Sequence, residues 1–277
     1  MAFAPILRRA SAAKNLFSLS STVVSSHSVR SLQTGASGDD PCGVCHSDLH
    51  VMKGEIPFSS PCVIIGHEIT GEVVEHGPLT DHKIIKRAKG TLYDGETRLF
   101  LRHDDSPVYM YSMGGCAVFT AYGATAHAAE IRPGDSIAVI GIGGVGCSCL
   151  QIARAFGASD IIAVDVQDDK LQNALTLGAT HIVNAAKENA VDRIRVGWCV
   201  DVAVEALGKP QTFMQCTLSV KDGGKAVMIG LSQAGSVGEI DINRLVKRKI
   251  KVIGSYGGRA RQDLPEVVKL AESGIQV

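Results

Sequence analysis

The chain has 277 residues, 45% of them hydrophobic, and its 28 basic residues balance its 28 acidic residues. This length is sufficient for two domains, and the composition is ordinary for a globular protein. The charge balance gives no support for nucleic-acid binding, and no apolar run reaches the ~20 residues of a membrane-spanning helix.

Residues 1–38 are rich in Ser and Ala and carry basic residues but no acidic residue. This composition is typical of an organellar transit peptide, whereas a secretory signal needs a continuous apolar stretch that the segment lacks. We therefore expect a mitochondrial location, with chloroplast or cytoplasm as alternatives. A disordered tail without an address is the alternative for the segment itself. The basic residues are Arg8, Arg9, Lys14 and Arg30.

The first half of the chain has little regular patterning but two clusters of metal-ligating residue types. From residue 39 to 93 the sequence reads as irregular, and from 95 to 113 as strand-like at best. The clusters are CGVCHSDLH at 42–50 and GHE at 66–68. Their Cys and His side chains indicate a metal site rather than a disulfide framework.

A catalytic zinc needs three protein ligands and an open fourth position, and Cys45, His67 and Cys116 are candidates for the three. Isolated Cys and His residues are more often structural. Cys42 and Cys45 could equally form half of a structural zinc site or a redox pair. The remaining cysteines are interpreted as small buried apolar residues, namely Cys62, Cys147, Cys149, Cys199 and Cys216.

In the second half, short apolar runs alternate with helical segments. This alternation predicts βαβ units and a parallel, buried sheet, and six strands make a complete doubly wound Rossmann domain. A last helix is expected over 264–273, with Asp263 as its N-cap and Pro265 in its first turn. The expected strands are 136–140, 160–164, 181–183, 200–204, 225–229 and 250–253, and the expected helices between them are 144–156, 168–177, 187–196 and 210–219.

The strongest motif is GIGGVG at 141–146, between the first of these strands and a helix. In a dinucleotide-binding turn, Gly141 would permit the tight turn and Gly143 would let a pyrophosphate approach the backbone. Gly146 would let helix and strand pack closely, and Gly144 would begin the helix, whose N-terminus attracts phosphates. The context therefore predicts a dinucleotide site.

Asp165 ends the next predicted strand. Its carboxylate is placed to accept hydrogen bonds from the adenosine ribose, and it would repel a 2′-phosphate, so NAD is favoured over NADP. The alternative is that Asp165 only caps the helix that starts near Asp168.

Four segments, CGVCHSDLH, GHEITGEVVEHG, GCAVFTAYGA and VIGIGGVGCSCLQIA, occur in this order. Together they resemble the zinc-dependent alcohol dehydrogenases of the medium-chain dehydrogenase/reductase superfamily over most of residues 41–274. The resemblance implies an α/β chain with a doubly wound Rossmann sheet at 129–277, which binds NAD. It also implies an incomplete, mostly β, GroES-like catalytic domain at 39–128.

The resemblance also assigns metal ligands. The catalytic zinc would be held by Cys45, His67 and Cys116, with Glu68 beside the metal as an occasional extra ligand. Asp48 would orient His67 by accepting its second N–H.

Further residues follow from the same resemblance. Ser47 would take the alcohol proton and His50 would pass it to solvent, while hydride moves to nicotinamide. Thr120 would line the nicotinamide face. Lys170 would accompany Asp165 at the ribose, with simple solvation as its alternative.

The chain departs from the family pattern in several places. The strands that precede the first ligand cluster are not found, and the sequence ends at Val277, before the C-terminal return of the catalytic domain. The four-cysteine lobe is missing, so we expect one zinc site and no structural zinc. Residues 195–199 replace a glycine-rich turn.

The expected function is NAD- and zinc-dependent oxidation of a small alcohol, or reduction of an aldehyde, with no nucleic acid or membrane as partner. A homo-oligomer through the edge strands of the Rossmann sheet, within 225–254, is a further expectation. The alternative is a catalytically inactive truncated isoform that acts as an NAD-binding or dimerising module. A zinc-free quinone reductase relative is the weaker third reading.

Overall fold

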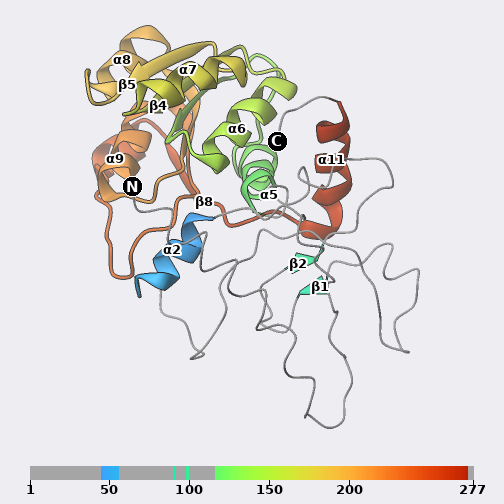
Figure 1. Ribbon diagram of the computed structural model, residues 1–277. Helices are drawn as coiled ribbons and strands as arrows, with labels where there is room; N and C mark the ends of the chain where they lie inside the picture. Colours follow the sequence, from blue (N-terminus) through green and yellow to red (C-terminus); the bar gives the residue numbers. More distant parts are fainter. Residues whose placement is uncertain (1–44, 56–89, 92–97, 100–115, 274–277) are drawn as a thin grey trace, which may run out of the picture.

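Six parallel strands form the central sheet of the computed structural model, which describes residues 45–55, 90–91, 98–99 and 116–273 (Figure 1). Their order is β5-β4-β3-β6-β7-β8, so the chain fills one half of the sheet and then the other. This is the doubly wound arrangement that the sequence predicts, with its switch point between β3 and β6. The strands are β3 (Ser136–Ile140), β4 (Asp160–Asp165), β5 (His181–Asn184), β6 (Val200–Glu205), β7 (Val220–Met228) and β8 (Lys251–Gly254).

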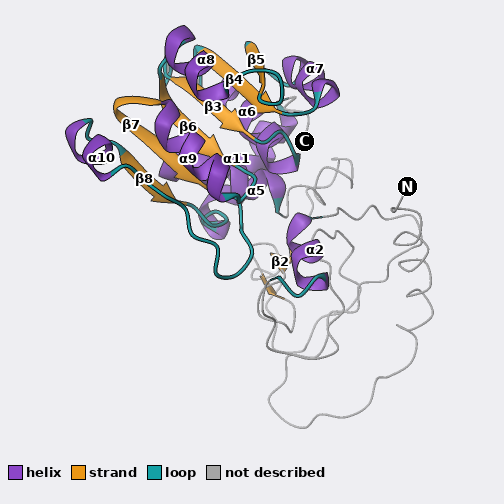
Figure 2. Ribbon diagram, turned by 90° about the vertical axis from the view of Figure 1, so that its left-hand side faces the viewer, coloured by secondary structure: helices purple, strands orange, loops and turns teal. Residues whose placement is uncertain are grey.

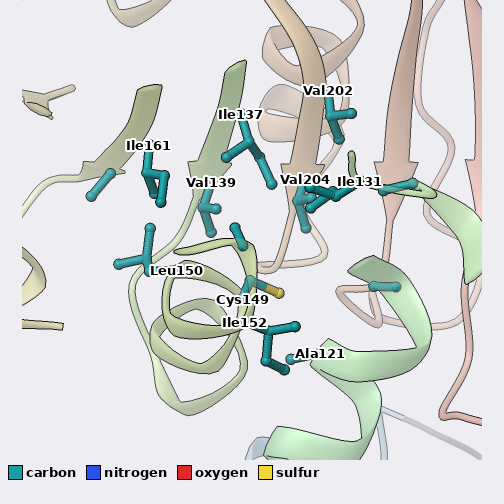
Figure 3. Close-up of a cluster of buried hydrophobic side chains, with 14 of the residues drawn as sticks. Ala121, Ile131, Ile137, Val139, Cys149, Leu150, Ile152, Ile161, Val202 and Val204 are labelled. Carbon is teal, nitrogen blue, oxygen red and sulfur yellow. The ribbon is translucent and has the colours of Figure 1, made fainter. Parts of the chain in front are cut away.

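Helices cover both faces of this sheet, and each face has its own apolar cluster. Along β3, Ile137 and Val139 belong to one cluster and Ala138 and Ile140 to the other, because successive side chains of a strand point to opposite faces. Figure 3 shows the first cluster against α6 and α5. The helices after β3 are α6 (Gly144–Ala155), α7 (Asp168–Thr176), α8 (Ala190–Gly197), α9 (Pro210–Ser219), α10 (Ile242–Lys247) and α11 (Ala260–Glu272).

A helix that the sequence patterns did not reveal enters this core from the N-terminal side. It is α5 (Ala117–Tyr122), which continues as the π-helix η1 (Gly123–Ala128). Ala121 and Ala124 are fully buried in the same cluster as α6. The small side chains let α5 approach α6 closely, so the start of α5 is fixed beside the start of α6.

The last helix corrects a prediction. It begins at Ala260, four residues earlier than expected, and Pro265 lies inside it. Asp263 is not the N-cap but a buried residue, whose Oδ2 accepts the backbone N–H of Arg259 and whose Oδ1 lies 2.9 Å from Nε2 of His127. The Asp263 carboxylate thus joins α11 to η1, a tertiary role that local sequence does not reveal.

Other element boundaries also differ. Residues 39–93 were expected to be irregular, yet α2 (His46–Met52) is a helix. Helix α8 begins at residue 190 rather than 187 because the Asn189 side chain accepts the N–H groups of Val191 and Asp192. Strand β7 begins at residue 220, ahead of an irregularity in its pairing with β6, and α10 was not expected. The short strands β1 (Gly90–Thr91) and β2 (Arg98–Leu99) pair antiparallel.

The segment that replaces a glycine-rich turn connects α8 to β6. Trp198 packs on His181, and the guanidinium of Arg193 lies 5.2 Å from the centre of a Trp198 ring. Cys199 adopts a φ of 49°, the left-handed region that glycine occupies with less strain. In the described part of the chain, no helix has the length and apolar character to cross a membrane.

Candidate functional site

The thiols of Cys45 and Cys116 lie 3.6 Å apart, although 71 residues separate them in the sequence. Cys45 immediately precedes α2 and Cys116 immediately precedes α5, and both are half-buried. The beginnings of two helices therefore bring together two of the predicted zinc ligands.

This distance fits a shared metal. Two thiolates that each lie about 2.3 Å from a tetrahedral zinc have their sulfur atoms about 3.8 Å apart. The other predicted ligands, His67 and Glu68, lie outside the described residues. Within 45–55, 90–91, 98–99 and 116–273, no three His, Cys, Asp or Glu residues are grouped to hold a metal, so the structure shows the cysteine pair of the predicted set.

Helix α2 carries the three residues expected to act beside the metal. Ser47, Asp48 and His50 are all half-buried on it. Nδ1 of His50 lies 2.5 Å from Oε2 of Glu55, a residue that the sequence interpretation missed. An ionised Glu55 accepts, so Nδ1 of a neutral His50 carries the proton and Nε2 is left as an acceptor. The expected partner of Asp48, His67, is not among the described residues.

Glu55 also connects α2 to the Rossmann half of the chain. The N–H of Ala234, in the segment after β7, donates to the backbone carbonyl of Glu55 at 3.0 Å. Figure 2 shows α2 outside the sheet, on the side toward which the strand arrows point. In doubly wound folds, ligands bind at this carboxyl edge of the sheet.

The glycine-rich loop has the geometry expected of a dinucleotide turn. Gly141 has a φ of 97°, and a Cβ on Gly146 would lie 1.9 Å from the carbonyl oxygen of Gly141. By contrast, a Cβ on Gly143 would meet nothing within 4 Å. The first and third glycines thus serve the turn and the helix packing, and the second leaves open space over the start of α6. Gly144 is exposed as the first residue of that helix.

Asp165 links the end of β4 to this loop. Its Oδ2 accepts the N–H of Ile142 at 2.8 Å, and its Oδ1 accepts those of Val166 and Gln167 at 2.8 and 3.1 Å. The N-cap residue of α7 is Gln167, so Asp165 is not the cap of that helix. A carboxylate has about four lone-pair sites, so three bonds leave capacity for one more donor.

Two further predicted residues lie near the same edge. Lys170 is exposed on α7. Burial raises the pKa of the Cys147 thiol at the start of α6, and the charge of Lys170 opposes that shift. The ammonium group of Lys170 is therefore close enough to the first turn of α6 to act on it electrostatically. Thr120 is half-buried on α5, one turn after Cys116.

Glu205, at the end of β6, is a buried carboxylate that the sequence interpretation missed. Its Oε1 accepts the N–H groups of Leu207 and Gly208 and the hydroxyl of Thr212, at 2.9, 2.8 and 2.7 Å. Leu207 packs against the turn so closely that a Cβ on Gly141 would lie 2.5 Å from its Cγ. The available signal was an acidic residue that ends an apolar strand three residues before a glycine.

The other cysteines only partly match the expectation of buried thiols. Cys149 and Cys216 are fully buried, and burial raises the pKa of Cys149 to about 12. Cys147 and Cys199 are half-buried instead. Cys42 and Cys62 fall outside the described residues.

Two families of known sequences match the chain. Residues 40–128 match the alcohol dehydrogenase GroES-like domain, and residues 144–273 match the zinc-binding dehydrogenases. An alcohol dehydrogenase of Geobacillus stearothermophilus is 31% identical over 277 residues, which cover 84% of this chain and 80% of the relative.

Solved structures give the same result. The crystal structure of benzyl alcohol dehydrogenase from Acinetobacter calcoaceticus has a TM-score of 0.75 and 25% identity, over 84% of this chain and 80% of that one. A zinc-binding dehydrogenase structure from Sinorhizobium meliloti, bound to NADP, has a TM-score of 0.73 and 25% identity, over 86% and 81% of the two chains.

Proposed function

Because the chain belongs to the zinc-dependent alcohol dehydrogenases of the medium-chain dehydrogenase/reductase superfamily, we propose that it oxidises a small alcohol to an aldehyde or ketone with NAD as hydride acceptor. Membership makes it an oxidoreductase that uses zinc and a nicotinamide coenzyme. The choice of NAD, the alcohol and the residues that act are the proposal. The observation that carries it is the 3.6 Å separation of the Cys45 and Cys116 thiols at the carboxyl edge of the sheet.

The glycine-rich loop and α6 bind the coenzyme pyrophosphate. Gly143 leaves room for the phosphates, and the first turn of the 12-residue helix supplies backbone N–H groups and the positive end of its dipole. Asp165 accepts a hydrogen bond from a ribose hydroxyl with its remaining lone pair, and Lys170 lies beside the same ribose. Like charge at Asp165 disfavours a 2′-phosphate, which supports NAD over NADP.

Cys45 and Cys116 would hold the zinc together with His67, with Glu68 as an occasional extra ligand. A zinc ion in such a site polarises the alcohol oxygen and lowers the pKa of its hydroxyl. Asp48 orients His67. Thr120, one turn along α5 from Cys116, lines the nicotinamide face. A single zinc is expected, because a structural-zinc lobe is absent from the sequence.

The proton of the alcohol leaves along α2. Ser47 accepts it and passes its own proton toward His50. The Nδ1–H of His50 donates to Glu55, which leaves Nε2 of His50 as the acceptor. Glu55 is thus a positioning residue for this relay. The half-buried ring of His50 then releases the proton to solvent.

The same proposal includes a homo-oligomeric assembly and a mitochondrial location. β8 is an edge strand, and Val237, Ile242 and Val246, which lie between β7 and β8 in the sequence, are exposed at 79%, 71% and 68%. Pairing of two copies along this edge would satisfy the unpaired backbone groups of β8, so we expect a homo-oligomer. The composition of residues 1–38 supports a mitochondrial destination.

The test is zinc analysis and NADH titration on one sample of purified full-length protein, with turnover measured on a panel of alcohols. We expect about one zinc per chain, NADH binding and NAD-dependent turnover. Cys45→Ser should lose zinc and turnover while keeping NADH affinity, and Cys199→Ser is the matched control because that thiol is also half-buried. NADH binding without zinc or turnover would instead identify an inactive coenzyme-binding module.

A further inference from the structure

The ends of β4 and β5 form the part of the carboxyl edge that is proposed to bind the adenosine ribose, and residues 165–170 and 184–187 are named the ribose corner. Asp165 ends β4 and Asn184 ends β5, and the two residues are partners in the parallel register. The N–H of Ala185 donates to the carbonyl of Asp165 at 3.0 Å. Helix α7 lies against both strands (Figure 1). The turn after β5 and the start of α7 therefore flank Asp165.

Asp168 joins α7 to this turn. It is the first residue of α7, and its Oδ1 accepts a side-chain N–H of Asn184 at 2.7 Å. The ammonium group of Lys187 donates to both carboxylate oxygens of Asp168, at 2.9 and 2.7 Å. The hydrogen bonds from Lys187 and then from Asn184 lower the pKa of the Asp168 carboxyl. Asp168 is therefore ionised at neutral pH and holds the ammonium group of Lys187 with both oxygens.

This ion pair is open to solvent. The side chains of Lys187 and Asp168 are 66% and 58% exposed. Ion pairs as exposed as this one add little to the free energy of unfolding, because water screens the two charges. Removing the pair should therefore leave the protein folded, so that its effect on a bound ligand can be measured.

The charges of the ribose corner do not balance. Asp165, Asp168 and Asp169 carry three negative charges, whereas Lys170 and Lys187 carry two positive charges. Because Lys187 is already bound to Asp168, its ammonium group is not available to a second anion. A phosphate group would bring nearly two more negative charges to this corner. The corner as it stands thus disfavours a phosphorylated ribose.

We propose that Asp168 is a second coenzyme-specificity residue, which disfavours a 2′-phosphate by withholding Lys187 from it and by adding its own negative charge to that of Asp165. This inference rests on the proposed function and deepens it. Asp165 acts on the ribose directly, whereas Asp168 acts through Lys187. Neighbouring strands lie about 4.8 Å apart, and lysine is a point charge on a flexible four-carbon stem. A released Lys187 can therefore reach a phosphate bound beside Asp165.

The experiment measures the Kd of NADH and of NADPH for the full-length protein by the fluorescence of the reduced coenzymes. Asp168→Asn removes the charge and keeps an oxygen for the side chain of Asn184. Asp169→Asn is the matched control, because Asp169 also lies in the first turn of α7. We expect Asp168→Asn to tighten NADPH binding about tenfold and to change NADH binding by less than about twofold. Asp169→Asn should tighten NADPH binding by less than about threefold, because it removes a charge without releasing Lys187.

Lys187→Gln shows whether Asp168 acts through this lysine. In the natural background it should weaken NADPH binding by less than about threefold, because the ammonium group is already bound to Asp168. Combined with Asp168→Asn, it should remove the tenfold gain, a coupling that a merely structural role of Asp168 would not produce.

The outcomes separate this inference from the proposed function. If NADH binds but Asp168→Asn gives no gain in NADPH affinity, or the gain persists without Lys187, or Asp169→Asn gives the same gain, the inference is wrong and the coenzyme site stands. A natural protein that binds neither coenzyme, or binds NADPH more tightly than NADH, refutes the proposed use of NAD and this inference together.

Discussion

Replacing Gly146 by alanine tests how closely α6 approaches the turn before it. The added Cβ would lie 1.9 Å from the carbonyl oxygen of Gly141. Carbon and oxygen normally keep about 3.3 Å apart, so helix and loop would have to separate by about 1.4 Å. Overpacking lowers the free energy of unfolding by about 1–3 kcal/mol, and a clash with a backbone oxygen belongs at the upper end of this range. Alanine has a higher helix propensity than glycine, which offsets up to about 1 kcal/mol of this loss. We therefore expect the free energy of unfolding to fall by about 2 kcal/mol.

Two neighbouring glycines supply the controls. A Cβ on Gly144 would lie 3.5 Å from the Cβ of Ala117, an ordinary contact, so Gly144→Ala should leave stability unchanged or raise it by up to about 1 kcal/mol. A Cβ on Gly143 meets no protein atom within 4 Å. Gly143→Ala should therefore keep its stability but lose about tenfold or more in NADH affinity, because the methyl group occupies the space meant for the pyrophosphate.

The assay is urea unfolding followed by far-UV circular dichroism, with NADH titration of the folded variants. A Gly146→Ala protein whose unfolding free energy stays within about 0.5 kcal/mol of the natural one would contradict the close helix–loop packing. A Gly143→Ala protein with natural NADH affinity would contradict the assigned phosphate site while leaving the packing argument intact.

Asp165→Gly should weaken the preference for NAD over NADP, and an unchanged ratio of the two affinities would refute the ribose assignment. Cys199→Gly should raise the unfolding free energy by about 0.5–1 kcal/mol. The strain energy relieved at this left-handed residue exceeds the free-energy cost of the extra entropy that glycine gives the unfolded chain. Thermal melts of this variant beside Cys199→Ser check the prediction. Burial raises the pKa of the Asp201 carboxyl, but hydrogen bonds from Lys221 and Ser136 outweigh burial and leave that pKa lowered. The stabilisation from this carboxylate is therefore present above about pH 4 and is lost as the pH falls through the lowered pKa. Asp201→Asn should flatten this part of the stability–pH curve, and an identical curve would show that the pairing is not formed.

The strands and long helices of the coenzyme-binding half were predictable from local pattern alone. Ser136–Ile140 is a β-branched, buried run, and α9 begins at Pro210 as expected, because proline suits the first turn of a helix. The short helices α2 and α10 were missed, since six or seven residues show too little periodicity for a helix prediction. Asp263 was misread as a cap because its partner, His127, is remote in the sequence.

The residues of the candidate site likewise divide into those that local sequence predicts and those that depend on tertiary structure. The roles of Gly141 and Gly146 follow from the motif, because the turn and the helix packing are local. The approach of Cys45 to Cys116 depends on where two helices start in space, and residue spacing alone left other pairings open. The side chains of Glu205 and Glu55 have partners only two to seven residues away, but these contacts form in the turns after β6 and after α2, whose conformation the sequence pattern did not predict.

The closeness of Ala117 to Gly144, where even an added methyl group would lie 3.5 Å from the Ala117 Cβ, has a consequence for the geometry of the reaction. Cys116 directly precedes Ala117, and Gly144 opens the helix over which the coenzyme would bind. One thiol of the cysteine pair is thus held at a fixed spacing from the coenzyme loop by two packed helices, whereas the other is carried by α2. The side-chain volume at Ala117 acts as a spacer: enlarging it would shift the distance over which hydride moves without touching zinc, coenzyme or alcohol.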